Sequence, residues 1–507
     1  VLKLDTMWSA GMPQLMELRA AMKTFQDAGK TIHAFSPVMD QSAYLAASAA
    51  DTVSIDPLGG VFLQGFGLFG NYFREGLEKL GVNVNVFRVG EFKSAVEPFI
   101  RNDMSPQARR ANQEWLGDLW REYDAQASQS RGLEAGAAHA YVEGFEQGLN
   151  QHRGDAAAYA LDRGLVTHVE SLREFRSRLK AQVGEDSKHG SFRQIHYLHY
   201  LRASQPMATE QVSKQIALVV VQGEIVDGRG EFGQAGGETV SRLLEQVRRD
   251  NSVAAVVLRV DSPGGSVWAS EQIRRGVQAL KAAGKPVVAS MSSVAASGGY
   301  WVSMDADRIL AHPSTVTGSI GIFGLIPTIE EPLQRVGIHS DGVGTTSLAG
   351  AFRIDRPLSA QVKAIIQSQI DKGYRDFLGG VSQGRGLPME QVEKLAEGRV
   401  WSGQDAQQLG LVDEMGGLRR ASEIAAELAG LQAGAWRLVE RAPATPFNLG
   451  LLKPFFGRLQ LDLPLLRNAA IQRLMQTTDL EAWLNRFNDP KGIYAHCMCR
   501  PSSGAQQ

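Results

Sequence analysis

The sequence predicts an α/β protein built from two copies of one fold. Short apolar runs rich in β-branched residues alternate with helical patterns, which is typical of strands paired in parallel through right-handed crossovers. The chain also resembles itself when each residue is compared with the one 256 positions later. Finally, 507 residues are more than one hydrophobic core usually serves. Two similar α/β domains account for all three observations.

The internal repeat begins at the first residue, where VLKLD (1–5) matches VLRVD (257–261). Further identities at the same shift are Tyr44 with Tyr300, Asp51 with Asp307, Pro57 with Pro313, Gly65 with Gly321, and Gly81 with Gly337. A different offset aligns RGLVT (163–167) with LGLVD (409–413). Matches spread so evenly along both halves indicate a duplicated domain.

The repeat also predicts the domain boundaries. We expect a first domain at 1–200, a second at 201–443 and a C-terminal extension at 444–507. The second copy has a strand near Ile216, ahead of the point where Val1 aligns. The first domain is therefore expected to be truncated at its N-terminus, and the chain to be a fragment of a longer protein.

The elements of the second copy follow from their residue patterns. The expected strands are IALVVVQGEIVDG (216–228), VAAVVLRVD (253–261) and PVVASMSS (286–293). The expected helices, with apolar residues at helical spacing, are 238–250, 270–284 and 357–380, the last matched by 105–124 in the first copy. The C-terminal extension is apolar and interrupted by proline, and we expect it to pack on the domain or on a neighbouring subunit.

Composition restricts the kind of partner. The chain has 53 basic and 54 acidic residues, a formal net charge of −1 and no Lys/Arg block, so a nucleic-acid partner is not expected. No apolar run approaches the roughly eighteen residues that a membrane helix needs. The two cysteines, Cys497 and Cys499, are too close in sequence for an unstrained bridge, and we expect them to be reduced and exposed.

Two glycine-rich turns of the second copy suggest acyl-transfer chemistry. Ser319 lies among glycines in TVTGSIGIFG (315–324), where a crowded turn exposes a hydroxyl. In DSPGGS (261–266), the consecutive N–H groups of Gly264 and Gly265 could bind an oxyanion. Ser319 is therefore the candidate nucleophile, and it needs a base within hydrogen-bond reach.

The candidate base lies in the first copy. Lys93 in VGEFKSAVEPF (89–99) is flanked by apolar and small residues, unlike the lysines of the helices. Burial lowers a lysine pKa from about 10.4 towards neutrality, which leaves a free amine that can accept the proton of a serine. Serine–lysine pairs are a known variant of the catalytic triad. Taken alone, the Lys93 segment fits a solvated loop residue better than a catalytic base.

The repeat favours the catalytic interpretation. At the 256-residue shift, Ser319 aligns with Leu63, and Lys93 aligns with Ala349. The first copy thus has the amine without the hydroxyl, and the second has the hydroxyl without the amine. Two incomplete sites make one complete site if Lys93 faces Ser319, either within one chain or between neighbouring chains.

Several motifs then resemble one family. VTGSIGIFG, RVDSPGGSV, SGGYW, VGEFKSAVEPFIRNDMSP and the terminal NDPKGIYAHC are similar to the long, two-copy bacterial type of the signal peptide peptidase A (protease IV) family. The resemblance covers nearly the whole chain. It implies two tandem domains of the Clp protease/crotonase superfamily, a Ser319–Lys93 dyad with oxyanion glycines from the second copy, and no cofactor or metal.

The resemblance carries further expectations. Family members degrade remnant signal peptides and other apolar peptides, are anchored in the bacterial inner membrane facing the periplasm, and assemble as homotetramers. Any such anchor would lie outside this chain. A hydroxyl side chain also orients the lysine in the family, and Ser340 in GIHSDGV is the candidate for that role here.

Two alternative functions remain open at this stage. A related acyl-thioester enzyme would use the same glycine N–H groups, but it would need paired acidic residues near them, and only Asp261 is present. A catalytically inactive scaffold would bind peptides or membranes through the apolar C-terminal extension. Covalent labelling of Ser319 would exclude the scaffold.

Overall fold

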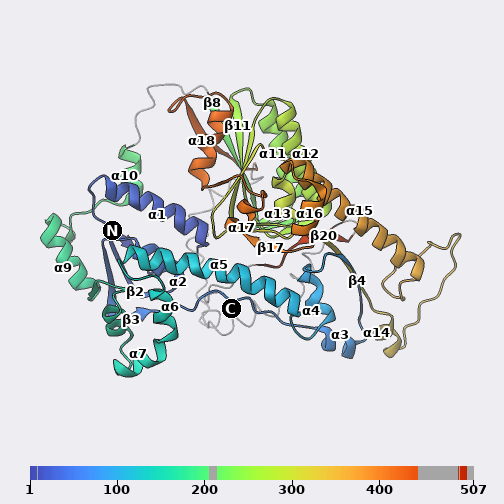
Figure 1. Cartoon of the computed structure of the whole chain (residues 1–507), viewed down its shortest axis with the longest axis horizontal. Helices are drawn as coiled ribbons and strands as arrows, with labels where there is room; N and C mark the ends of the chain where they lie inside the picture. The colour runs from blue at the N-terminus through green and yellow to red at the C-terminus, as the bar shows by residue number, and fades with distance from the viewer. Residues whose placement is uncertain (8–9, 205–213, 444–488, 490–491, 500–507) are drawn as a thin grey trace. The chain divides into compact units, whose positions relative to one another are not determined.

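The protein is described by a computed structural model that covers residues 1–7, 10–204, 214–443, 489 and 492–499 (Figure 1). Two compact units are present. The first comprises residues 1–69 and 114–204, and the second comprises Gly70–Gln113 and the described residues from Lys214 onward. Residues 70–113, which precede the expected domain boundary, thus pack with the second copy.

The first unit is built on a four-stranded sheet. Its strands are β1 (Leu2–Lys3), β2 (His33–Met39), β3 (Thr52–Val61) and β5 (His168–Val169), paired in parallel in that order. Its helices are α1 (Met12–Asp27), α2 (Gln41–Ser48), α6 (Ala137–Glu143), α7 (Phe145–Gln151), α8 (Ala156–Asp162), α9 (Leu172–Val183), α10 (Tyr197–Ser204) and most of α5 (Pro106–Ser130). A short hairpin, β6 (Glu185–Asp186) and β7 (Ser191–Phe192), follows α9.

The second unit has a larger main sheet in the order β17-β15-β13-β11-β8-β19, with β14 and β18 branching from β13. Its strands are β8 (Lys214–Gln222), β11 (Val253–Ser262), β13 (Val287–Ala296), β14 (Arg308–Ala311), β15 (Val316–Gly318), β17 (Val400–Ser402), β18 (Glu414–Met415) and β19 (Trp436–Arg441). The expected strands at 253–261 and 286–293 are confirmed. The expected strand at 216–228 is instead two strands, because Gly223 breaks it with a φ of +80°.

Helices cover both faces of this sheet (Figure 1). α18 (Leu418–Leu428) packs on one face, while α11 (Gly237–Arg249) and α12 (Val267–Ala282) pack on the other. The long helix expected at 357–380 is α15 (Ala360–Arg385). The remaining helices of this unit are α3 (Arg74–Leu80), α4 (Glu97–Ile100), α13 (Gly298–Ser303), α14 (Glu330–Arg335), α16 (Met389–Leu395) and α17 (Gly403–Gln408).

A second sheet of the same unit has the order β10-β9-β12-β20-β16-β4. Its strands are β4 (Asn83–Val89), β9 (Glu224–Val226), β10 (Gln234–Gly236), β12 (Gly264–Ser266), β16 (Ile322–Thr328) and β20 (Ile493–His496). β4 pairs antiparallel with β16 along all seven of its residues. This pairing is the physical reason that residues 70–113 belong to the second unit.

The duplication predicted from the sequence is confirmed by equivalent hydrogen bonds in the two units. The hydroxyl of Tyr44 donates to the carbonyl of Leu165 at 3.0 Å, and that of Tyr300 donates to the carbonyl of Leu411 at 2.9 Å. The strand orders β1-β2-β3-β5 and β11-β13-β14-β18 also correspond, both with parallel pairing. The fold is therefore a tandem α/β repeat.

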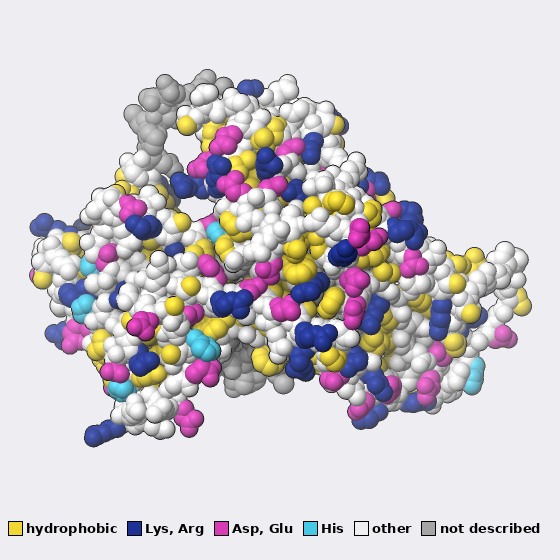
Figure 2. Space-filling model, viewed as in Figure 1, with side chains coloured by type: hydrophobic (Ala, Val, Ile, Leu, Met, Phe, Trp, Pro, Cys, Tyr) yellow, Lys and Arg dark blue, Asp and Glu magenta, His cyan; other side chains and the backbone are white. Residues whose placement is uncertain are grey.

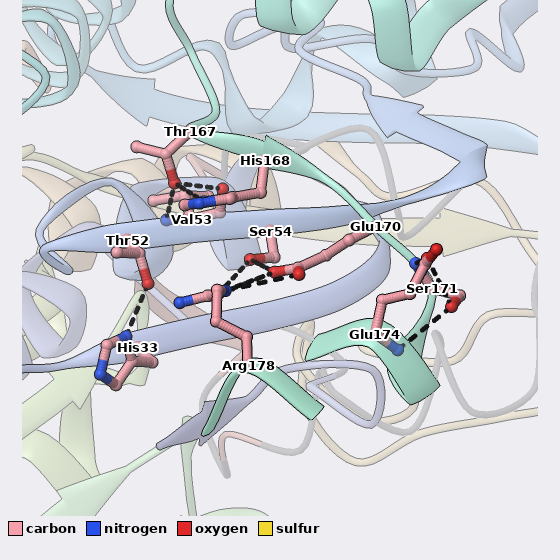
Figure 3. Close-up of polar contacts among 10 residues, drawn as sticks. All are labelled: His33, Thr52, Val53, Ser54, Thr167, His168, Glu170, Ser171, Glu174 and Arg178. Atoms are coloured by element: carbon pink, nitrogen blue, oxygen red, sulfur yellow. Dashed lines mark hydrogen bonds and ion pairs between the residues drawn. The ribbon is translucent and has the colours of Figure 1, made fainter. Parts of the chain in front are cut away.

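A polar cluster on the first unit's sheet illustrates how this unit satisfies its buried charge (Figure 3). Glu170 accepts hydrogen bonds from the hydroxyl of Ser54 and the guanidinium of Arg178, both at 2.7 Å. Burial alone would raise the pKa of Glu170, but these bonds outweigh it and hold the pKa below its usual value. Ser171 and Glu174 form a capping box at the start of α9. All these contacts are structural.

The molecular surface carries mixed charge. On the face shown in Figure 2, Lys and Arg side chains alternate with Asp and Glu side chains, and neither sign dominates a large area. The helices within the described residues are too short or too polar to span a bilayer.

The two cysteines of the C-terminal extension differ from the expectation, although β20 packs on the second unit. Cys497 and Cys499 form a disulfide and are buried, so the prediction of reduced, exposed thiols is wrong. The bridge closes because the chain turns sharply between them, with Met498 at a φ of +52°. Residues 444–488, on which most of the expected packing rests, lie outside the described residues.

Candidate active site

Lys93 is brought to the second unit by the strand before it. After β4, the chain turns at Gly90, which has a φ of +107°, and Lys93 stands immediately before the short 3-10 helix η1 (Ser94–Val96). Its exposed fraction is 1%. A lysine so fully buried is unusual, and its contacts explain the burial.

The Lys93 side chain is directed at two serines. Nζ lies 2.8 Å from Oγ of Ser297, 3.2 Å from Oγ of Ser319 and 3.2 Å from the carbonyl oxygen of Ser319. All three residues belong to the second unit of a single chain. The expected approach of Lys93 to Ser319 is present within one chain, together with a closer approach to Ser297 that was not expected.

Burial changes the acid–base behaviour of the Lys93 amine. Desolvation lowers the pKa of Lys93 well below its ordinary value of 10.5, because the charged form is disfavoured away from water. The groups bonded to Nζ are hydroxyl and carbonyl oxygens. The neutral amine, which can accept a proton, is therefore populated at pH values where a solvated lysine is charged.

Glycines make room for the lysine. A Cβ on Gly398, which has a φ of +78°, would lie 2.8 Å from the backbone nitrogen and Cα of Lys93. A Cβ on Gly321 would lie 3.3 Å from Lys93 Cδ. The carbonyl of Glu397 accepts the N–H of Phe92 at 2.9 Å. The loop around Gly398 thus holds the lysine backbone in place.

Ser297 occupies the turn where β13 passes into α13. Its φ of 56° and ψ of −112° lie in a region that residues other than glycine rarely adopt. The Ser297 N–H donates to the carbonyl of Gly318 at 2.8 Å, which helps to hold this backbone. A serine on a strained strand-to-helix turn is the arrangement that presents the nucleophile in the α/β-hydrolases.

The Gly264–Gly265 pair adjoins this turn. Gly264 has a φ of +97°, and a Cβ on it would lie 2.5 Å from the backbone nitrogen of Gly298. Gly265 is the central residue of β12 and pairs with Ile225 on one side and Ala495 on the other. The glycines expected to bind an oxyanion therefore lie next to the residue that follows Ser297.

Ser319 has a different setting. It follows β15 with a φ of 50°, and its N–H donates to the carbonyl of Arg399 at 2.7 Å. Both its hydroxyl and its carbonyl oxygen face the Lys93 amine. Two oxygens from one residue fix the direction in which that amine points.

Ser340 is not part of this site, so the prediction for it is wrong. The side chain is exposed, and its hydroxyl donates to Asp355 at 2.6 Å. The physical reason is that residues 339–350 form an exposed segment without helix or strand. Ala349, the counterpart of Lys93, lies in the same exposed segment.

The sequence analysis did not single out Ser297 by itself. A signal was available, because the SGG of Ser297–Gly299 lies just beyond the expected strand at 286–293, and directly after the observed strand β13. The counterpart of Ser297 at the 256-residue shift is Gln41, so the first copy lacks this hydroxyl too. Within the described residues, no group of three or more His, Cys, Asp or Glu side chains is placed to hold a metal ion.

Comparison with known proteins places the chain in a peptidase family. The pattern of peptidase family S49 matches residues 24–184 and 279–432, one segment in each copy. "Protease 4" of Haemophilus influenzae is 40% identical over 510 residues, which cover 98% of this chain and 82% of the relative. "Protease 4" of Salmonella typhi is 39% identical over 507 residues, covering 98% of this chain and 80% of the relative.

Two further matches are more distant. "Serine protease SPPA, chloroplastic" of Arabidopsis thaliana is 28% identical over 433 residues, covering 83% of this chain and 62% of the relative. The structure of a ClpP1 mutant from Listeria monocytogenes aligns with 40% of this chain and 93% of its own, at 19% identity and a TM-score of 0.27, which is too low to support an argument. The match over both copies, and the identity to relatives over at least 80% of their length, show that this chain belongs to peptidase family S49.

Proposed function

We propose that the chain is a serine endopeptidase in which Ser297 is the nucleophile, Lys93 is the general base and Ser319 orients the lysine. The observation that carries this proposal is the buried Lys93 amine, 2.8 Å from Ser297 Oγ and 3.2 Å from Ser319 Oγ. The assignment exchanges the roles of the two serines relative to the sequence analysis. The strained turn at Ser297 and the adjoining Gly264 favour the exchange.

The proposed reaction uses these groups in sequence. The neutral Lys93 amine takes the Ser297 hydroxyl proton as Oγ bonds to the carbonyl carbon of the scissile peptide. The protonated lysine then donates that proton to the departing amine as the C–N bond breaks. Water, deprotonated by Lys93, attacks the acyl-enzyme, and the proton returns to Ser297 as the acid is released.

The oxyanion is bound in this proposal by backbone N–H groups beside Ser297. The N–H of Gly298 follows the nucleophile directly, and Gly264 and Gly265 adjoin it. Donors of this kind are worth roughly 2.7–4 kcal/mol each at the transition state. Asp261, the acidic residue that the thioester alternative would use, instead accepts the N–H of Val294 at 3.1 Å.

The substrates we propose are extended apolar peptides, signal peptides among them. Support comes from a relative of Enterococcus faecium named "Putative signal peptide peptidase SppA", 30% identical over 209 residues, and from a buried apolar cluster that contains Phe323 and Val96, which lies three residues after Lys93. On the family resemblance alone, we further propose a homotetramer at the periplasmic face of the inner membrane. Light scattering of the purified protein and flotation of the full-length protein with vesicles test these two points.

The experiment that tests the chemistry is labelling with a fluorophosphonate, followed by mass analysis of the labelled peptide. The parent, Ser297→Ala, Ser319→Ala and Lys93→Met are compared, with Ser340→Ala as the matched control at an exposed serine. One adduct on Ser297, lost in Ser297→Ala and slowed strongly in Lys93→Met, is expected. An adduct on Ser319 would restore the original assignment, and no adduct on folded parent protein would reject the peptidase.

A further inference from the structure

The proposed nucleophile is closed off from solvent. Ser297 is 0% exposed, and Gly264 and Gly265 beside it are also buried. An endopeptidase must admit an extended main chain to its nucleophile, so something now occupies the space that the substrate would need. Helix α12 and the C-terminal strand β20 both contact α13 and β12 there, and of the two only β20 is an extended segment paired with β12.

β20 fills a slot that is one strand wide. It lies between β12 and β16 and runs antiparallel to both, with Ala495 opposite Gly265 and Tyr494 opposite Phe323. β12 and β16 do not pair with each other. Without β20, each would present an unpaired edge to the other across a gap that fits one extended peptide, which is how peptides add to open sheet edges.

The backbone of β20 lies against the glycines next to Ser297. The carbonyl oxygen of Ala495 would be 2.0 Å from a Cβ on Gly264 and 3.1 Å from a Cβ on Gly298. A peptide carbonyl thus lies at the glycines that the proposed mechanism assigns to the oxyanion. No other peptide carbonyl can occupy this place while β20 is docked.

A side chain of β20 also fills an apolar pocket. Tyr494 is 3% exposed and packs against Ala95, Val96 and Phe323, with its ring 5.8 Å from that of Phe323. Ala95 and Val96 belong to the turn that follows Lys93. The pocket that would receive a large apolar side chain of a substrate therefore holds one from the chain itself.

Both ends of β20 are fastened to the unit. On one side, the carboxylate of Asp489 accepts the hydroxyl of Ser266 at 2.5 Å and the N–H of Trp268 at 3.2 Å. On the other, the N–H of Cys497 donates to the carbonyl of Pro263 at 3.0 Å. These contacts hold the four residues of β20 in register with β12 and β16 through noncovalent interactions alone.

We propose that β20 is a built-in pseudo-substrate, which occupies the peptide slot beside Ser297 and must leave before a substrate binds. The inference rests on the proposed function, because it assigns a regulation to that same site. The docked strand is the resting state. A peptide that enters pairs with β12 and β16 in its place and presents an apolar side chain to the pocket of Tyr494.

The test compares rates of fluorophosphonate labelling at Ser297. One variant ends at residue 488 and lacks β20, a second carries Tyr494→Ala, and the control ends at residue 499 and retains β20. If the docked state outnumbers the open state by about nine to one, both β20 variants should label about tenfold faster than the parent. The control should match the parent.

A peptide of residues 489–499, with its two cysteines oxidised, is then added to the chain that ends at 488. It should slow labelling and raise KM for a peptide substrate without changing kcat, whereas a scrambled peptide should do neither. Labelling of both folded β20 variants at the parent's rate or more slowly would overturn the inference. If the shortened chain does not fold, Tyr494→Ala decides by itself.

The two proposals fail in different ways. If the parent and every variant remain unlabelled at both Ser297 and Ser319, the serine peptidase itself is rejected. If the parent labels at Ser297 and removal of β20 gives no acceleration, the peptidase stands and the pseudo-substrate is rejected.

Discussion

Gly398 lies directly against the backbone of Lys93. A Cβ at this position would lie 2.8 Å from three lysine atoms, N, Cα and Cβ, and the φ of +78° at Gly398 favours glycine. No side chain other than hydrogen fits without a shift of the lysine. The position of the proposed base is thus set by a residue more than three hundred positions away in the sequence.

Gly398→Ala should therefore lower kcat/KM, because it displaces the proposed base. A displacement of about 1 Å at a reacting group can cost on the order of a hundredfold in rate. Gly386→Ala is the matched control, because Gly386 has a φ of +66° and nothing within 4 Å of its Cβ position. Both variants should lower the melting temperature through the positive φ, Gly398→Ala more so because of its contact with Lys93, but only Gly398→Ala should lose kcat/KM. Equal activity in the two variants would contradict a positioning role.

The pH dependence of activity should reflect Lys93. The base must be neutral, and desolvation lowers the pKa of Lys93 well below 10.5. The kcat/KM should rise with pH, because deprotonation creates the active form, and should level off well below pH 10.5. A rate profile measured on a peptide substrate checks this. A limb that continues to rise up to pH 10.5 would show that the lysine is not desolvated in solution.

The stability of the folded protein should also rise with pH. In the unfolded chain Lys93 regains its ordinary pKa, so unfolding takes up a proton at every pH between the two pKa values. The free energy of unfolding should then rise with pH across this window by about 1.4 kcal/mol per pH unit from this one group.

Lys93→Met removes this cost of burial. The variant should be more stable than the parent at pH 7, and the difference should shrink towards pH 10 in urea unfolding. Lys394→Met, at a lysine with 74% of its side chain exposed, is the control and should show no such trend. A parent that is more stable than Lys93→Met at pH 7 would mean that the buried amine keeps its charge.

Arg178→Met should weaken the first unit without touching the chemistry. It leaves Glu170 without its ionic partner, and hydrogen bonds to charged groups contribute about 1.5–3 kcal/mol each. Because the folded-state pKa of Glu170 is lowered, this stabilisation is present above the ordinary carboxyl pKa and is lost as the pH falls through the folded-state value. Calorimetry at pH 7 and pH 3 measures both effects. Ser297 labelling at 25 °C should equal that of the parent.

The sequence was most informative where local pattern and function coincide. β11 and β13 were predicted because runs of β-branched apolar residues are typical of buried strands. The duplication was predicted because identical residues recur at a fixed shift. Lys93 was identified by asymmetry between the copies, a signal that does not depend on knowing which serine it meets. Ser340 was predicted wrongly because a loop carries no periodicity that would place its hydroxyl.

Other features depend on three-dimensional information. Ser297 and Ser319 each have a positive φ and lie beside glycines, and the distances to Lys93 and the contact of Gly264 with Gly298 separate their proposed roles. Residues 70–113 join the second unit through the pairing of β4 with β16, which involves positions far apart in the chain. β20 is only four residues long and its pairing depends on two distant strands, so no local pattern predicts it.

The spacing of the reacting residues along the chain has a consequence for biosynthesis. Lys93 precedes Ser297 by 204 residues and Ser319 by 226, and β20 (Ile493–His496) follows both serines in the sequence. A polypeptide emerging from the ribosome therefore carries the amine long before it carries either hydroxyl, and it remains inert until most of the second copy has been translated. Because the chain grows from its N-terminus, the proposed blocking strand β20 is synthesised after every residue of the proposed site, so that site stays open until β20 has been translated.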